Sequence, residues 1–227
     1  MTPYPPAKSY VKDLVMTWDA PRFTCDYSQP ASYRFSMDSI LLAKAAVRDF
    51  AEREWSPQAR VLDLCAGAGV VGLEFAHLEP RAKNFDFVEI QTDYRPSFEE
   101  NLVKAHALGL TARGHFMNHR ELRAPEFAAA YDLVLCNPPY FDPGRGPLPP
   151  DALKARSRFF VDASFRDLLE TLMFVMKAGA FAYVLTRDQK EHGDDRTREL
   201  TRALSGRAEL VATEDLRGTS LQILRRL

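Results

Sequence analysis

Short apolar runs alternate with segments of helical periodicity along most of this chain, and that alternation limits the possible folds more than any other feature. Alternation of this kind favours a parallel, doubly wound α/β sheet with helices on both of its faces. The apolar runs that we expect to form strands cover residues 60–65, 85–90, 112–117, 131–136, 180–186, 208–213 and 220–225.

Only a few residues separate the last two expected strands, too few for a helical crossover, so these two should pair antiparallel. The predicted architecture is therefore a sheet of about seven strands with the last one antiparallel. Residues 138–163 should form a long, proline-rich loop. Helices are expected over about 38–55, 71–78, 96–108, 165–176 and 195–204, with a short one between 118 and 130.

Composition excludes some classes of protein. With a formal net charge of −1 over 227 residues, the chain as a whole is not a strongly basic nucleic-acid binder. Three cysteines without a CxxC pair fit a reducing compartment. No apolar run reaches the roughly 18 residues of a membrane-spanning helix. We therefore expect a cytoplasmic protein that has no membrane partner.

One local segment is basic. Residues 144–158 carry four cations against one anion, Asp151. Such a loop can contact phosphates even in a nearly neutral chain, although solubilising charge on a surface loop is the alternative. The four cations are Arg145, Lys154, Arg156 and Arg158.

A glycine-rich turn follows the first expected strand. Residues 67–72 read Gly-Ala-Gly-Val-Val-Gly, and Glu89 ends the next strand about twenty residues on. Gly67 and Gly69 would let the backbone approach a nucleoside, and the Glu89 carboxylate would accept hydrogen bonds from ribose hydroxyls. A nicotinamide dehydrogenase would share these features. Asp63, just before the turn, favours a ligand with a cationic amino group over one with a pyrophosphate.

Asn137-Pro138-Pro139-Tyr140 follows the fourth expected strand. Ligands bind outside the carboxyl ends of the strands in such a sheet, so this loop should face the same crevice as the glycine turn. The prolines fix the backbone, so that the Asn137 side-chain oxygen and the Pro138 carbonyl can hold both hydrogens of one –NH₂ group. Two acceptors placed in this way suit methyl transfer to a conjugated amine, with Tyr140 and Phe141 stacking on a planar target.

At these residues the chain resembles class I methyltransferases that use S-adenosylmethionine to methylate amino nitrogens. Residues 29–43, Gln-Pro-Ala-Ser-Tyr-Arg-Phe-Ser-Met-Asp-Ser-Ile-Leu-Leu-Ala, are similar to a segment of the bacterial tRNA(Val) adenine-N6 methyltransferases. The resemblance spans roughly residues 29–186. It implies a Rossmann-like class I methyltransferase domain over residues 37–227, preceded by an N-terminal segment, residues 1–36, that packs on or leads into it.

The motifs and the resemblance together assign roles to single residues. The catalytic residues would be Asn137, Pro138, Pro139 and Tyr140. The cofactor-binding residues would be Phe35, Asp38, Asp63, Cys65, Gly67, Gly69, Glu89, Ile90, Asn118 and Asn137. The substrate-binding residues would be Tyr33, Arg34, Phe141, Arg145, Lys154, Arg156 and Arg158.

The chain departs from the family pattern at three places. Ser32 stands where a glycine is usual, and Asn118 stands where an aspartate would bind the adenine amine of the cofactor. The Ala-Arg-His-Glu run expected after the catalytic loop reads Ala-Arg-Ser-Arg at residues 155–158. Because that run belongs to the loop that should touch the substrate, this departure bears on substrate identity.

The predicted function is methyl transfer from S-adenosylmethionine to the exocyclic amine of adenine in RNA, with tRNA as the expected partner. A monomer or weak dimer is expected, and no metal. His115 and His119 are four residues apart, but they fall at a strand end and a turn, so we interpret them as surface histidines. The alternatives are a protein glutamine-N5 methyltransferase, a nicotinamide dehydrogenase and a non-catalytic module that binds S-adenosylmethionine and RNA.

Overall fold

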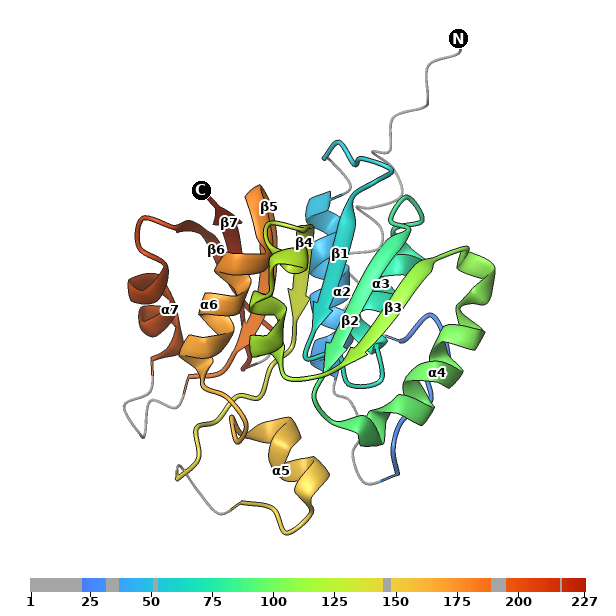
Figure 1. The fold of residues 1–227 in the computed structure, drawn as a ribbon, viewed down its shortest axis with the longest axis horizontal. Helices are drawn as coiled ribbons and strands as arrows, with labels where there is room; N and C mark the ends of the chain where they lie inside the picture. The colour runs from blue at the N-terminus through green and yellow to red at the C-terminus, as the bar shows by residue number, and fades with distance from the viewer. Residues whose placement is uncertain (1–21, 32–36, 51–52, 145–147, 189–194, 217) are drawn as a thin grey trace.

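The computed structural model describes residues 22–31, 37–50, 53–144, 148–188, 195–216 and 218–227 (Figure 1). Within these residues, seven strands form one sheet in the order β3-β2-β1-β4-β5-β7-β6. The strands are β1 (Arg60–Leu64), β2 (Asn84–Glu89), β3 (Thr111–Phe116), β4 (Tyr131–Cys136), β5 (Met176–Thr186), β6 (Ala208–Asp215) and β7 (Ser220–Arg226).

The pairing of the strands confirms the predicted fold class. Strands β1 to β5 are parallel to one another, and β7 is antiparallel to both β5 and β6. The last strand therefore inserts between β5 and β6. The central strands β1 and β4 are covered on both faces, which explains why they read as continuous apolar runs. The edge strand β6 instead alternates exposed and half-buried residues.

Helices cover both faces of the sheet (Figure 1). One apolar core lies beneath α2, α3 and α4, and a second lies beneath α6 and α7. The α-helices are α2 (Met37–Phe50), α3 (Val70–Leu78), α4 (Arg95–Lys104), α5 (Ala152–Arg158), α6 (Phe165–Val175) and α7 (Arg196–Leu204). The 3₁₀ helices are η1 (Thr92–Tyr94), η2 (His106–Leu108), η3 (His119–Arg123) and η4 (Pro125–Phe127).

Several expected boundaries were wrong. Residues 138–163 are not loop throughout, because α5 forms after Asp151, whose side chain caps it by accepting from Lys154 N at 2.8 Å. The first helix is described over Met37–Phe50 and does not reach Trp55, because residues 53–55 are not helical. The short helix expected between 118 and 130 is split into η3 and η4, and β5 starts at Met176, where the preceding helix has just ended.

Residues 24–28 lie against α3 and α4. Thr24 Oγ1 and Tyr27 Oη donate to the two carboxylate oxygens of Glu74 at 2.7 and 2.9 Å. Ser28 N donates to Asn101 Oδ1 at 2.6 Å, and Asn101 Nδ2 donates in turn to Ala68 O at 2.9 Å. This segment therefore supports the helices that follow β1 and β2 and, through Asn101, the glycine turn.

Candidate active site

The glycine turn forms one wall of a cavity of about 300 Å³ at the carboxyl ends of β1, β2 and β4. Gly67 and Gly69 have left-handed backbone, with φ of 54° and 78°. L side chains rarely adopt that conformation. A Cβ at Gly69 would also lie 2.9 Å from the Phe98 ring, so α4 packs against the turn only because this residue is glycine.

A buried carboxylate supports the turn from beneath. Asp63 is fully buried, and its Oδ2 accepts from Gly72 N at 2.7 Å. Burial raises the pKa of this carboxyl. The structure places Asp63 under the turn, outside the set of described residues that line the cavity. Asp63 therefore holds the first turn of α3 in this structure.

A second carboxylate, Glu89, stands at the end of β2 and lines the cavity. Its Oε2 accepts from Gly67 N at 2.9 Å, and its Oε1 accepts from Gln91 N at 2.8 Å. Burial raises its pKa against the opposing effect of these backbone hydrogen bonds. A carboxylate has about four lone-pair sites, so Glu89 retains acceptor capacity toward a ligand. Beside it, Ile90 keeps 37% of its surface exposed, which offers an apolar contact.

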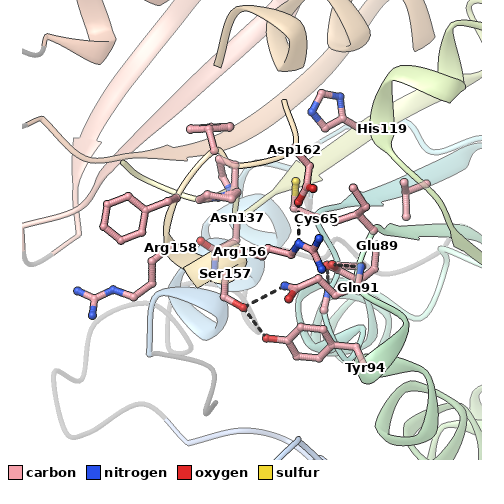
Figure 2. Close-up of a pocket in the computed structure, with 18 of the residues that line it drawn as sticks. Cys65, Glu89, Gln91, Tyr94, His119, Asn137, Arg156, Ser157, Arg158 and Asp162 are labelled. Atoms are coloured by element: carbon pink, nitrogen blue, oxygen red, sulfur yellow. Dashed lines mark hydrogen bonds and ion pairs between the residues drawn. The ribbon is translucent and has the colours of Figure 1, made fainter. Parts of the chain in front are cut away.

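The loop after β4 lies across the cavity from Glu89 (Figure 2). Asn137 Nδ2 donates to Ser39 Oγ at 3.3 Å, and Asn137 Oδ1 accepts from Tyr140 Oη at 2.9 Å. Tyr140 Oη also lies 3.3 Å from Asp38 Oδ2. These contacts fix the Asn137 amide plane from α2 on one side and from its own loop on the other.

Residues 156–163 cover the cavity, and we call them, with the rest of α5, the roof. The Arg158 carbonyl accepts from Tyr140 N at 3.1 Å and from Phe141 N at 3.0 Å. Phe160 N then donates to Phe141 O at 2.8 Å, in a short parallel bridge between the two segments. The roof and the loop after β4 therefore form one hydrogen-bonded unit.

Most of the residues singled out in the sequence come together at this cavity. Those that line it are Asp38, Cys65, Gly67, Glu89, Ile90, Asn118, Asn137, Pro138, Pro139, Tyr140, Phe141, Arg156 and Arg158. Three others, Asp63, Gly69 and Lys154, do not belong to its lining. The remaining ones, Tyr33, Arg34, Phe35 and Arg145, lie outside the described residues.

The cations of the basic segment differ in their surroundings. Arg156 Nε is 3.0 Å from Asp162 Oδ2, so its charge is compensated within the roof. Arg158 is exposed and lies over the Phe141 ring at 5.9 Å. Sequence reasoning missed Arg187, which is exposed and lines the cavity at the end of β5. Its position directly after an expected strand was the available signal.

His115 and His119, which the sequence led us to interpret as surface histidines, are each only partly exposed. His115 Nε2 lies 2.9 Å from Asp86 Oδ1. His119 lines the cavity, and burial lowers its pKa to about 4. Among the residues that the structure describes, no group of three His, Cys, Asp or Glu side chains could hold a metal ion.

Asn118, the residue at the expected aspartate position, joins η3 to the roof. Its Oδ1 accepts from Arg120 N at 3.0 Å, and its Nδ2 donates to Asp162 O at 3.1 Å. An aspartate could make the first contact but has no hydrogen for the second. This roof contact is a physical reason for an amide at position 118.

The fold and the site define the class of protein. A sheet in the order 3-2-1-4-5-7-6 with β7 antiparallel, and a glycine turn after its first strand, is the class I methyltransferase fold. The chain belongs to the methyltransferase small domain family, which matches residues 35–149. The family implies S-adenosylmethionine as cofactor. No helix in the described part of the chain is both long enough and apolar enough to cross a membrane.

Curated relatives confirm the resemblance found in the sequence. The tRNA1(Val) (adenine(37)-N6)-methyltransferase of Tolumonas auensis is 30% identical over 143 residues, 60% of this chain and 56% of that protein. The protein of the same name from Serratia proteamaculans is 27% identical over 139 residues, 59% of this chain and 52% of that protein. The chain thus spans about half of the length of these relatives.

Solved structures share the fold at lower identity. TrmN from Thermus thermophilus superposes with a TM-score of 0.56 at 22% identity, over 83% of this chain and 49% of that one. P. horikoshii TYW2, in complex with MeSAdo, superposes with a TM-score of 0.56 at 15% identity, over 86% and 65% of the two chains. Both likenesses concern the fold alone.

Proposed function

We propose that this methyltransferase transfers a methyl group from S-adenosylmethionine to the exocyclic amine of adenine in RNA, with tRNA as the substrate. The observation that carries the proposal is that Asn137 and Pro138, whose side-chain and backbone oxygens can accept hydrogen bonds, line the same cavity as the Glu89 carboxylate. The curated relatives, which are tRNA1(Val) (adenine(37)-N6)-methyltransferases, support adenine in tRNA as the target. The same proposal takes residues 37–227 as the methyltransferase domain and residues 1–36 as a segment leading into it.

The cofactor side of the cavity fits a nucleoside. Glu89 can accept from ribose hydroxyls, because a carboxylate has about four lone-pair sites and the backbone hydrogen bonds do not use all of them. Ile90 offers an apolar face for an adenine ring, and Gly67 allows close approach of the backbone. A cavity of about 300 Å³ lies in the range of small-molecule sites. S-adenosylmethionine, when bound, supplies an electrophilic sulfonium methyl group.

The catalytic side orients the amine. An adenine amine is a poor nucleophile because its lone pair is delocalised into the ring. Asn137 and Pro138 would accept its two hydrogens and favour a tetrahedral nitrogen whose lone pair points at the methyl group. The target hydrogen would take the place of the Tyr140 hydroxyl on Asn137 Oδ1, a contact of 2.9 Å in this structure. Tyr140 and Phe141 would then stack on the base.

Two exposed arginines line the cavity that an RNA substrate would have to enter. Arg158 and Arg187 line the cavity, and neither has an ion-pair partner among the described residues. Unpaired cations of this kind are available to phosphates, and exposed loop bases are easier to turn into a pocket than duplex bases. Arg156 contributes less, because Asp162 compensates its charge.

The deciding experiment is transfer of labelled methyl from S-adenosylmethionine to unmodified tRNA, with ribosomal RNA, DNA and a protein release factor in parallel. Nucleoside and peptide mass spectrometry would identify the products. We expect N6-methyladenosine in tRNA, and a loss on the order of 10²-fold or more with Asn137→Ala, the size of effect seen when an oriented polar group is removed. Label confined to protein would instead establish the glutamine methyltransferase.

A second experiment tests the phosphate contacts. Arg158→Gln with Arg187→Gln should weaken RNA binding and reduce the slope of log affinity against log salt by about 1.4 to 1.8, roughly 0.7 to 0.9 per lost contact. Arg202→Gln, which changes an exposed arginine on α7, is the matched control. An unchanged slope in the double variant would contradict this assignment.

A further inference from the structure

The hydroxyl of Ser157, near the end of α5, lies where this helix meets the connection after β2 (Figure 2). Ser157 Oγ donates to Leu153 O, one turn earlier in the helix, at 2.7 Å. Gln91 Nε2 lies 3.2 Å from the same oxygen, and Tyr94 Oη lies 2.9 Å from it. Because Leu153 takes the single hydroxyl hydrogen, Ser157 Oγ is the acceptor for both Gln91 and Tyr94.

Both donors belong to the cofactor side of the cavity. Gln91 N donates to Glu89 Oε1 at 2.8 Å. The Tyr94 ring packs on the glycine turn, since a Cβ at Gly67 would lie 3.5 Å from Tyr94 Cε1, an ordinary van der Waals distance. Tyr94 is itself buried. A ligand that contacts Glu89 and Gly67 therefore restrains the two residues that hold Ser157.

The residue after Ser157 belongs to the catalytic side. The Arg158 carbonyl accepts from the backbone N–H groups of both Tyr140 and Phe141, at 3.1 and 3.0 Å. These are the first two N–H groups after the prolines, so they set where the loop beyond Asn137 lies. A shift of α5 would move this carbonyl and release the loop.

We propose that Ser157 is a positioning residue, which couples binding of the cofactor to the placement of the catalytic loop. When a ligand is bound to Glu89 and Gly67, the side chains of Gln91 and Tyr94 keep α5 in place. The helix in turn keeps the Arg158 carbonyl hydrogen-bonded to Tyr140 N and Phe141 N. This inference rests on the proposed function, because it takes Glu89 as the cofactor side and Asn137 as the target side.

Hydrogen exchange tests the coupling without catalysis. S-adenosylhomocysteine is added to the full chain, and exchange is followed in peptides covering residues 137–141 and 67–72. Because prolines carry no amide hydrogen, the first peptide reports only Asn137, Tyr140 and Phe141. In the natural chain we expect the ligand to slow exchange in both peptides. In Ser157→Ala the slowing should persist at 67–72 and disappear at 137–141.

Kinetics supply the second readout. Ser157→Ala and Tyr94→Phe should each lower kcat about tenfold, the value of one hydrogen bond. The double variant should lose no more than the larger single loss, because both changes break the same contact. Ser157→Thr keeps the hydroxyl and should restore kcat and the exchange pattern. Ser205→Ala, an exposed serine after α7, is the matched control.

The outcomes separate this inference from the proposed function. Natural protein that binds S-adenosylhomocysteine but methylates no RNA would refute the function and leave the exchange experiment to decide the coupling. Ligand-induced protection at 137–141 that survives in Ser157→Ala would overturn the coupling, whatever the activity. If Ser157→Ala does not fold, Tyr94→Phe against Ser157→Thr gives the same decision.

Discussion

The turn after β1 and the roof over the cavity face the same space, yet they are held in different ways. The turn is held by two buried carboxylates, Asp63 and Glu89, which accept from backbone N–H groups within adjacent strands and their loops. The roof is held by contacts between distant segments, and many of its side chains are exposed; Arg156, for example, keeps 48% of its side chain in solvent. Few buried contacts mean low local stability.

This difference assigns different tasks to the two regions. A turn fixed by short, buried contacts can bind a ligand of constant shape. Binding then costs little free energy, because the turn is already ordered. A roof fixed by exposed contacts can open for a large substrate and close over it. We therefore expect substitutions in the turn to change affinity for the cofactor, and substitutions in the roof to change the catalytic rate and RNA binding.

The largest effect should come from the turn region. Glu89→Ala removes the acceptor for ribose hydroxyls and for Gly67 N. We expect affinity for S-adenosylmethionine to fall about 10- to 100-fold, because hydrogen bonds to charged groups are worth about 1.5–3 kcal/mol. Titration calorimetry measures this loss, with exposed Glu99→Ala as control. Unchanged affinity would show that Glu89 does not bind the cofactor and would contradict the role given to the turn.

A smaller effect is expected from a buried ion pair beside the roof. Arg196, only 6% exposed, contacts Asp142 at 2.8 Å and lies 4.8 Å from the centre of the Phe165 ring. Arg196→Met should lower the free energy of unfolding by about 1–3 kcal/mol, less than for a fully buried pair, because Asp142 is 39% exposed and can be hydrated. Denaturant unfolding measures the change.

A more exposed arginine in a similar ion pair provides the matched control for Arg196→Met. Arg207 pairs with Glu170 at 2.8 Å, but both side chains are more than one-third exposed. Arg207→Met should cost no more than about 1 kcal/mol, as for other surface pairs. Arg196→Met should also lower kcat more than it lowers affinity for S-adenosylmethionine, since Asp142 follows the catalytic loop. Equal losses of unfolding free energy in the two variants would show that burial of Arg196 does not strengthen its ion pair.

The last expected effect is a pH dependence of stability that comes from His119, which lines the cavity. His119 has a pKa of about 4 in the folded protein and an ordinary value of 6.5, so the unfolded chain takes up a proton first as pH falls. Stability from this group is present above pH 6.5 and is lost as pH falls toward 4. His119→Gln should reduce the slope of stability against pH by at most about 1.4 kcal/mol per pH unit, the value for uptake of one proton.

Unfolding experiments at several pH values between roughly 4.5 and 7.5 measure the slope of stability against pH. Exposed His106→Gln is the control for loss of a histidine. If natural protein and His119→Gln lose stability in parallel across the window, His119 is not held neutral by its surroundings, and the buried character of this part of the cavity is refuted.

The order of strands and helices and the two motifs at the cavity could be predicted from the amino-acid sequence alone. Gly67, Glu89 and Asn137 could be found because each is tied to its own strand end by local chemistry, and parallel strands bring such ends together. The antiparallel pairing of the last two strands followed from the short connection between them. These features depend on residues close together in the chain, which is why their pattern is readable.

The contacts that hold the roof could be found only in the folded protein. Ser157 and Gln91 are 66 positions apart and meet through the packing of α5 on the loop after β2. The roles of Arg187 and Asn118, the burial of His119 and the insertion of β7 between β5 and β6 depend on distant partners in the same way. Local propensity does not encode such contacts, because each is selected by the free energy of the whole packed chain.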